Sequence, residues 1–278
     1  MPILPLRKLA DSPNESLKRD FLDEIEATLN DDAADRNALC RRTLCSLLYP
    51  EYASNWDTAV DDASLPAATR LALLALDPRN INLEPEYYAE CDDARFALTK
   101  PLLWLWYSFD RTPLGGQNVD LGVRLRRVLA QRIFRKCGEN FKAFQFTEFS
   151  FGYNMEVGDN VVVHRHVVLD DRGGIVLGDR VSISDYANVY SHTHSIVDQK
   201  DVTDAVTRID ADARITYHAT VLAGVHVGEN AMVGAGAIAT KDVLSYHVNV
   251  GIPAKSIRVK PSAPPHLLHL TTVKPPRQ

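Results

Sequence analysis

In the second half of the chain, aliphatic residues recur at every sixth position. Four residues after each of them stands a small or β-branched residue, as at Val161, Ala187 and Ala219. The aliphatic series is Val157, Val163, Leu169, Leu177, Ile183, Val189, Ile209, Ile215, Val221, Val227 and Val233, with Ala239 as its weakest member. This period is neither that of an α-helix nor that of a simple hairpin, and it predicts a β-helix in which each hexapeptide forms one flat side of a three-sided prism.

The predicted β-helix has four coils, 157–174, 177–194, 209–226 and 227–244. Aliphatic side chains fill the prism, small residues fit its corners, and each coil buries its side chains only against its neighbours. Two irregularities interrupt the repeat, namely extra residues near 172–174 and a longer excursion from Ser195 to about Arg208. Because loops on a rigid scaffold often carry function, the segment VYSHTHSIVD (189–198) at the root of this excursion is a candidate site.

The first half of the chain has a helical pattern. Leu17, Phe21, Ile25 and Leu29 form one stripe of a helix over 13–29, and further helices are expected over 34–50, 64–78 and 122–138. The predicted organisation is a helical N-terminal domain (1–117), a connecting amphipathic helix and entry segment (118–150), the β-helix (151–260) and a Pro-rich extended tail (261–278).

Composition excludes several classes of protein. The net charge is −5 and the isoelectric point about 6.0, so the chain as a whole presents no basic field for nucleic acid or a membrane surface. The longest apolar run, 101–109, is far shorter than a membrane span, and a buried helix is the expected alternative. The N-terminus lacks the apolar core of a signal peptide, and four scattered cysteines without a CxxC motif indicate a cytoplasmic protein with reduced thiols.

Several segments of the second half resemble one known family. They are FGYNMEVGDN (151–160), VLDDRGGIVLGDRVSI (168–183), the loop at His194, VLAGVHVGENAMVGAGAIATKDV (221–243) and GIPAKSIRV (251–259). The resemblance, over about 118–260, is to the hexapeptide-repeat acyltransferases with a left-handed β-helix, and within them to the maltose, galactoside and nodulation-factor O-acetyltransferases. It implies an enzyme that transfers an acyl group from acetyl-CoA to a hydroxyl of a sugar-like or other small acceptor, without a metal. It also implies a homotrimer with its sites in the clefts between subunits.

The resemblance assigns roles to individual residues. His194 takes the position of the general base, which fits the chemistry because an imidazole can remove a hydroxyl proton near neutral pH. The residues that the resemblance places against coenzyme A are Tyr217, Ala235, Thr240, Lys241, Lys255 and Arg258. For Lys255 and Arg258 the alternative to phosphate binding is a pair of exposed charges at the start of the tail.

The acceptor side departs from the family pattern. His164 and His166 stand where close relatives have asparagines, Arg172 stands where the galactoside enzyme has a carboxylate, and Ser195 replaces a proline. The candidates for acceptor binding are His164, Asp171 and His192. His164 could instead pack where the subunits of the trimer meet. His192 could support the site from behind, lie at the surface or, with His194, form part of a metal pair.

Three other functions remain open from the sequence. A serine acetyltransferase fits the layout, but its characteristic histidine after Leu169-Asp170 and its DRHPK loop are absent. A γ-carbonic anhydrase-like zinc enzyme would need a second histidine where Ala223 follows His218. A non-catalytic trimeric scaffold that displays the N-terminal domain is the third alternative.

Overall fold

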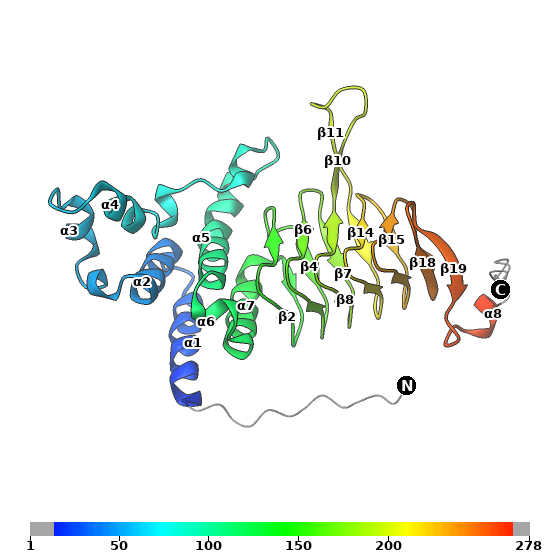
Figure 1. Cartoon of the computed structure of the whole chain (residues 1–278), viewed down its shortest axis with the longest axis horizontal. Helices are drawn as coiled ribbons and strands as arrows, with labels where there is room; N and C mark the ends of the chain where they lie inside the picture. Colours follow the sequence, from blue (N-terminus) through cyan, green and yellow to red (C-terminus); the bar gives the residue numbers. More distant parts are fainter. Residues whose placement is uncertain (1–13, 269–278) are drawn as a thin grey trace.

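The protein is a helical N-terminal region joined to a three-sided β-helix (Figure 1). The computed structural model describes residues 14–268. The prediction of a left-handed parallel β-helix that follows helices is confirmed. The N-terminal helices are α1 (Glu15–Leu29), α2 (Arg36–Leu48), α3 (Trp56–Asp61), α4 (Ala67–Leu74), α5 (Asp93–Asp110), α6 (Pro113–Gly116) and α7 (Val119–Ile133), with the 3₁₀ turns η1 (Pro50–Tyr52), η2 (Pro78–Asn80) and η3 (Glu84–Tyr87).

Three sheets form the sides of the prism. The first contains β1 (Lys136–Cys137), β4 (Met155–Val157), β7 (Ile175–Leu177), β12 (Thr207–Ile209) and β15 (His226–Val227). The second contains β2 (Lys142–Ala143), β5 (Val162–Val163), β8 (Ser182–Ile183), β13 (Arg214–Ile215), β16 (Met232–Val233), β18 (His247–Val250) and β19 (Lys255–Val259). The third contains β3 (Glu148–Phe149), β6 (Val168–Asp170), β9 (Asn188–Tyr190), β14 (Thr220–Val221) and β17 (Ile238–Ala239). The neighbouring strands pair in parallel except β18 and β19, which form an antiparallel hairpin.

The periodic aliphatic residues fill the prism as expected, because each of them is at most 2% exposed. One further coil, formed by β1 to β3, precedes the four coils that the period predicts. Its strand β1 pairs in parallel with β4 of the next coil, with Lys136 in register with Glu156. Its inward positions are Cys137, Ala143 and Phe149. These three side chains differ in size and chemistry, and they do not continue the series of aliphatic residues. The hexapeptide pattern therefore does not reveal this coil.

The recurring Gly-Asp pairs hold neighbouring coils together at one corner. Asp179 Oδ1 accepts a hydrogen bond from the backbone N–H of Asp159 at 2.9 Å, and Asp159 Oδ1 accepts one from Glu139 at 2.7 Å. A Cβ atom on Gly158 would lie 2.4 Å from Asp179 Oδ1, so only glycine leaves room for this carboxylate. Each pair therefore supplies both the acceptor and the space that the stacking requires.

The helical region covers the first coil and shares its core. The ring of Phe149 packs edge-on against Trp106 and Phe134, with centroids 5.3 Å and 5.2 Å apart. Below this aromatic cluster, the buried Arg126 guanidinium donates to Asp110 Oδ1 at 2.8 Å and to the carbonyl of Ala143 at 3.2 Å. Helices α5 and α7 thus close one end of the prism and form one hydrophobic core with it.

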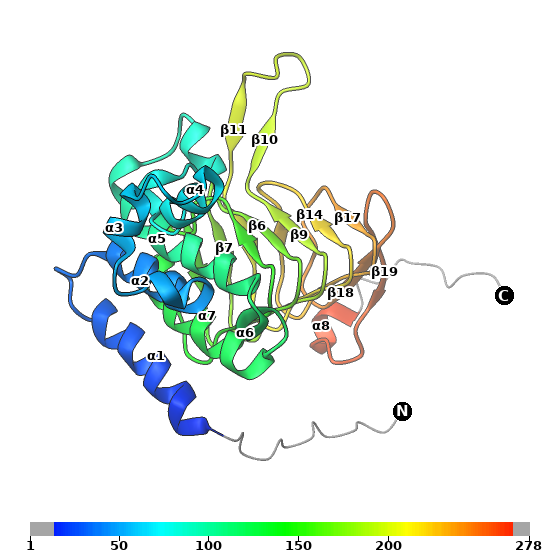
Figure 2. The same ribbon diagram turned by 60° about the vertical axis from the view of Figure 1, so that its left-hand side comes forward.

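An antiparallel hairpin leaves the prism after β9. It consists of β10 (His192–His194) and β11 (Val202–Asp204), and it stands clear of both the helices and the β-helix (Figures 1 and 2). At the other end of the prism the chain continues into α8 (Pro265–Leu268). The first part of the tail predicted as extended therefore contains a helical turn, and residues 269–278 lie outside the described part of the chain.

Candidate active site

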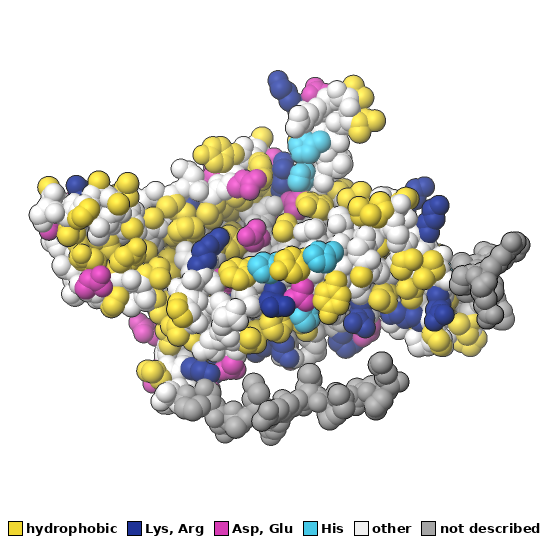
Figure 3. All heavy atoms as spheres, viewed as in Figure 1, with side chains coloured by type: hydrophobic (Ala, Val, Ile, Leu, Met, Phe, Trp, Pro, Cys, Tyr) yellow, Lys and Arg dark blue, Asp and Glu magenta, His cyan; other side chains and the backbone are white. Residues whose placement is uncertain are grey.

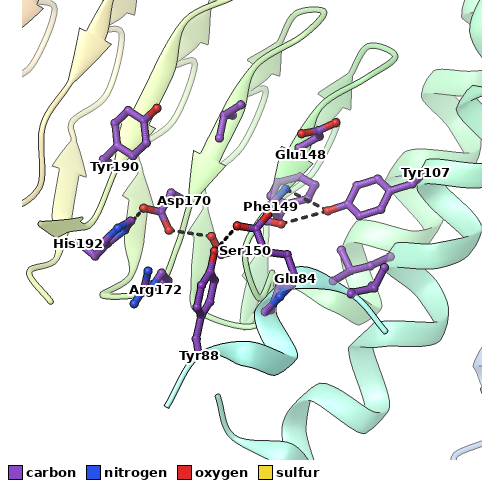
Figure 4. Close-up of a pocket in the computed structure, with 14 residues that line it drawn as sticks. Glu84, Tyr88, Tyr107, Glu148, Phe149, Ser150, Asp170, Arg172, Tyr190 and His192 are labelled. Atoms are coloured by element: carbon purple, nitrogen blue, oxygen red, sulfur yellow. Dashed lines mark hydrogen bonds and ion pairs between the residues drawn. The ribbon is translucent and has the colours of Figure 1, made fainter. Parts of the chain in front are cut away.

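A cavity of about 400 Å³ lies where the helical region meets the outer face of the third sheet (Figure 4). Its walls come from η3 and α5 on one side and from β3, β6, β9 and β10 on the other. The apolar part of the lining is Leu83, Pro85, Leu103, Phe149 and Val168, with the tyrosines Tyr88, Tyr107 and Tyr190. The polar part is Glu84, Glu148, Ser150, Asp170, Arg172 and His192.

One wall of the cavity carries a chain of polar groups. Nδ1 of His192 contacts Asp170 Oδ2, and Ser150 Oγ donates to Asp170 Oδ1 at 2.7 Å. Asp170 is 4% exposed and is fixed further by the buried Ser191, whose hydroxyl donates to its backbone carbonyl at 2.6 Å. Because both oxygens of Asp170 are used, the His192 ring is held in one orientation with Nε2 left for the cavity.

The facing wall is built around Tyr88. Its hydroxyl donates to Glu84 at 2.5 Å, and the Arg172 guanidinium lies 4.0 Å from its ring centroid. Arg172 also forms an ion pair with Glu90. Burial, followed by the hydrogen bond to Glu84, raises the pKa of Tyr88 to about 12, so its phenol is a hydrogen-bond donor and stays neutral.

His194 lies on the hairpin, next to His192 but not in the lining of this cavity. The two imidazole rings meet edge to face, with centroids 5.3 Å apart. His194 is exposed, and its Nδ1 lies 2.8 Å from the backbone carbonyl of Gln199 on the same hairpin. Since a carbonyl oxygen only accepts, this contact places the proton on Nδ1 and leaves the lone pair on Nε2.

Asp171, expected to bind the acceptor, lies outside the lining of this cavity. Its side chain is fully buried, with Oδ1 accepting from the N–H of Phe151 at 2.8 Å and Oδ2 from that of Asn154 at 3.0 Å. Burial raises its pKa to about 6, against the opposing effect of these backbone donors. The carboxylate that reaches the cavity is the preceding one, Asp170, because the extra residues at this corner change which side chain points outward.

His164 also lies away from the cavity. It stacks on Phe144 at the prism edge between the second and third sheets, with centroids 5.0 Å apart. Beside it, a second ladder of stacked rings runs along the same edge, and Figure 3 shows it as alternating hydrophobic and histidine side chains. This ladder consists of Phe146, His166, Tyr186 and His218.

The residues expected to bind coenzyme A fall into three places. Tyr217 and Ala235 sit on adjacent coils at the edge between the second and third sheets, where the N–H of Gly236 donates to Tyr217 O at 2.8 Å. Thr240 and Lys241 follow β17 on the opposite edge of the third sheet. The third place is β19, whose exposed Lys255 and Arg258 have no acidic partner within residues 14–268.

Residues 14–268 contain neither a candidate metal centre nor a candidate membrane-spanning helix. No group of three or more His, Cys, Asp or Glu side chains in that range could hold a metal ion. His218, the residue considered for a zinc site, is stacked on Tyr186 at 4.9 Å. Within the same range, no helix is long and apolar enough to cross a bilayer.

No family model matches the chain, but several known proteins are similar to it in sequence or in fold. The galactoside O-acetyltransferase of Escherichia coli (strain K12) is 29% identical over 140 residues, which cover 49% of this chain and 69% of that protein. A maltose O-acetyltransferase from Clostridium difficile 630 superposes with a TM-score of 0.53 at 24% identity, covering 63% of this chain and 91% of the other. A hexapeptide-repeat acetyltransferase from Vibrio cholerae, solved with acetyl coenzyme A, superposes with a TM-score of 0.53 at 20% identity, covering 64% and 94%.

The chain is thus similar in sequence to the galactoside O-acetyltransferase, and it has the fold of the maltose O-acetyltransferase. The resemblance inferred from the sequence motifs is thereby confirmed, and so is the expectation of an acyltransferase. The sequence did not reveal Asp170, Ser150 or the helical wall of the cavity as parts of the site. The signal that could have identified Asp170 is its place at the end of β6, just before the irregular corner.

Proposed function

We propose that this protein moves an acetyl group from acetyl-CoA to a hydroxyl of a small acceptor bound in the cavity beside His192. The observation that carries the proposal is the pair of adjacent imidazoles, each held through Nδ1, of which His192 lines a cavity large enough for a small organic molecule. The Vibrio cholerae relative solved with acetyl coenzyme A supports the choice of donor. Release of free thiol from acetyl-CoA in the presence of a hydroxyl acceptor tests this function.

His194 is proposed as the general base. Its Nε2 accepts the hydroxyl proton while the acceptor oxygen attacks the thioester carbonyl, which forms a C–O bond and a tetrahedral oxyanion. Collapse of this intermediate breaks the C–S bond, and the proton held on Nε2 passes to the departing thiolate. The exposed position of His194 supports this role, because a thioester can reach its ring without displacing a buried side chain.

Lys255 and Arg258 are proposed to bind the phosphates of coenzyme A. Both are exposed cations at one end of the prism, and a phosphate would provide the charge-assisted hydrogen bonds that they lack within residues 14–268. Replacing both by alanine is expected to raise KM for acetyl-CoA about tenfold or more and to leave kcat within about twofold, since the reacting groups are untouched. Lys136→Ala, an exposed lysine at the other end of the prism, is the control. An unchanged KM for acetyl-CoA in the double variant removes the phosphate assignment.

A homotrimer with sites between subunits is proposed as the active assembly. Support comes from the separation of the predicted coenzyme A residues, because the third sheet lies between Tyr217 on one edge and Lys241 on the other. A coenzyme bound between two copies could contact one edge of each chain. The hairpin tip adds to this, since Ile196 and Val197 are 103% and 91% exposed in a single copy (Figure 3). Light scattering is expected to give three times the 31.0 kDa chain mass, and a monomer with full activity would contradict the proposal.

A further inference from the structure

The charges around the cavity do not balance. Arg172 forms an ion pair with Glu90, and the two carboxylate oxygens of Asp170 are taken by His192 and by the Ser150 hydroxyl. Glu84 and Glu148 have no cationic partner within residues 14–268. Glu84 accepts from the neutral hydroxyl of Tyr88, so two exposed carboxylates in the lining are left without a counter-ion within that range.

The rest of the lining is apolar and aromatic. Phe149 and Leu103 are buried beneath the cavity, and Tyr107 is locked to the Phe149 backbone, accepting from its N–H at 3.0 Å and donating to its carbonyl at 3.1 Å. Figure 4 shows the Tyr190 ring on the opposite wall, with the Glu148 carboxylate on the side of Tyr107. A ligand in this cavity therefore contacts rings and aliphatic side chains, with the carboxylates of Glu84 and Glu148 among them.

We infer that the acceptor is a hydroxyl compound that carries a protonated amine on an apolar or aromatic body. This inference rests on the proposed function, whose cavity it uses. An ammonium group in the cavity offsets the charge of Glu84 and Glu148, and the rings of Tyr107 and Tyr190 attract a cation further through their negative faces, whereas Arg172 already lies over the ring of Tyr88. Carboxylates accept but do not donate, so anionic acceptors such as phosphorylated or carboxylated alcohols are repelled.

The helical region supplies the residues on which this preference depends. Glu84 and Tyr88 come from η3 and the residue after it, and Tyr107 comes from α5. These residues precede the β-helix in the sequence, and they reach the cavity because the helical region packs against the third sheet. The β-helix thus carries the acyl-transfer groups, and the helices add the wall that selects the acceptor.

Three acceptors with one ring, one secondary hydroxyl and different charge test the inference. They are N,N-dimethylphenylethanolamine, phenylethanediol and mandelate, which are cationic, neutral and anionic at neutral pH. The tertiary amine cannot form a stable amide, so thiol release with the cation reports transfer to oxygen. We expect kcat/KM to fall about tenfold from the cation to the neutral diol and further to the anion.

Variants tie the preference to the two carboxylates. Glu84→Gln combined with Glu148→Gln is expected to lower kcat/KM for the cation about tenfold, with the diol and KM for acetyl-CoA within about twofold. Glu139→Gln removes an exposed carboxylate distant from the cavity lining and is expected to change none of these values. Equal use of cation and diol by the unmodified enzyme, or an equal loss for both in the double variant, overturns the inference.

Calorimetry with the same three compounds separates this inference from the proposed function. Tighter binding of the cation than of the diol, lost in the double variant, supports the charge preference whether or not transfer occurs. Preferred binding without thiol release contradicts the proposed function alone. Thiol release without any preference in binding or transfer contradicts the acceptor class alone.

Discussion

Alanine in place of His194 is expected to lower turnover at least a hundredfold while acetyl-CoA still binds. A positioned general base contributes about 10²–10⁴ in rate, and alanine removes the imidazole that is proposed to take the hydroxyl proton. The fold should survive, because His194 is exposed and its side chain contacts only the Gln199 carbonyl and the edge of His192. Thiol release measures the rate, and calorimetry measures acetyl-CoA binding.

His192→Ala is the matched control for this loss. It removes the neighbouring imidazole from the same strand, and its expected effect is a higher KM for the acceptor with a loss in kcat of about tenfold or less. Near-normal turnover in His194→Ala together with a hundredfold loss in His192→Ala would contradict the assignment. The general base would then be His192, oriented by Asp170.

Replacing Arg126 by methionine is expected to destabilise the protein by about 3–5 kcal/mol. Arg126 and Asp110 have side chains only 1% and 2% exposed, and the guanidinium also satisfies the carbonyls of Ala143 and Gly115. Burial raises the pKa of Asp110 and Arg126 lowers it, so the substitution leaves a buried carboxylate without its counter-ion. The free energy of unfolding in urea measures the effect.

Two further variants test whether the loss of stability arises because the ion pair of Arg126 is buried. Arg135→Met breaks an ion pair with Glu156 whose arginine is 60% exposed, and a cost of at most about 1 kcal/mol is expected. Combining Arg126→Met with Asp110→Leu should recover part of the loss, because no unpaired charge then remains. Equal small losses at both arginines would show that the helical region and the prism are not held together at Arg126.

The β-helix was predictable because one physical rule repeats. Each inward position must be aliphatic to fill a prism of constant width, so the period appears in the sequence as at Val157, Val163 and Leu169. The rule fails at the first coil, where α5 and α7 cover the end of the prism and Phe149 packs against Trp106. A residue that packs against helices as well as its own coil is free to be larger, and the repeat is lost.

The acceptor side was not predictable in the same way. Asp170 and Asp171 are adjacent and chemically identical, and only the path of the corner decides that Asp170 faces the cavity while Asp171 holds backbone N–H groups inside. Glu84 and Tyr88 reach the cavity from a segment far away in sequence, with no motif that marks them. The site residues that depend on local periodicity are therefore visible in the sequence, and those that depend on the packing of two regions are not.

The most direct measurement for the central claim is a crystal structure of the protein with coenzyme A bound. We expect the coenzyme sulfur within about 4 Å of His194 Nε2, with the cavity lined by His192 opening toward the same point. A sulfur atom held far from His194, or a coenzyme bound away from the hairpin that carries it, would contradict the proposed catalysis.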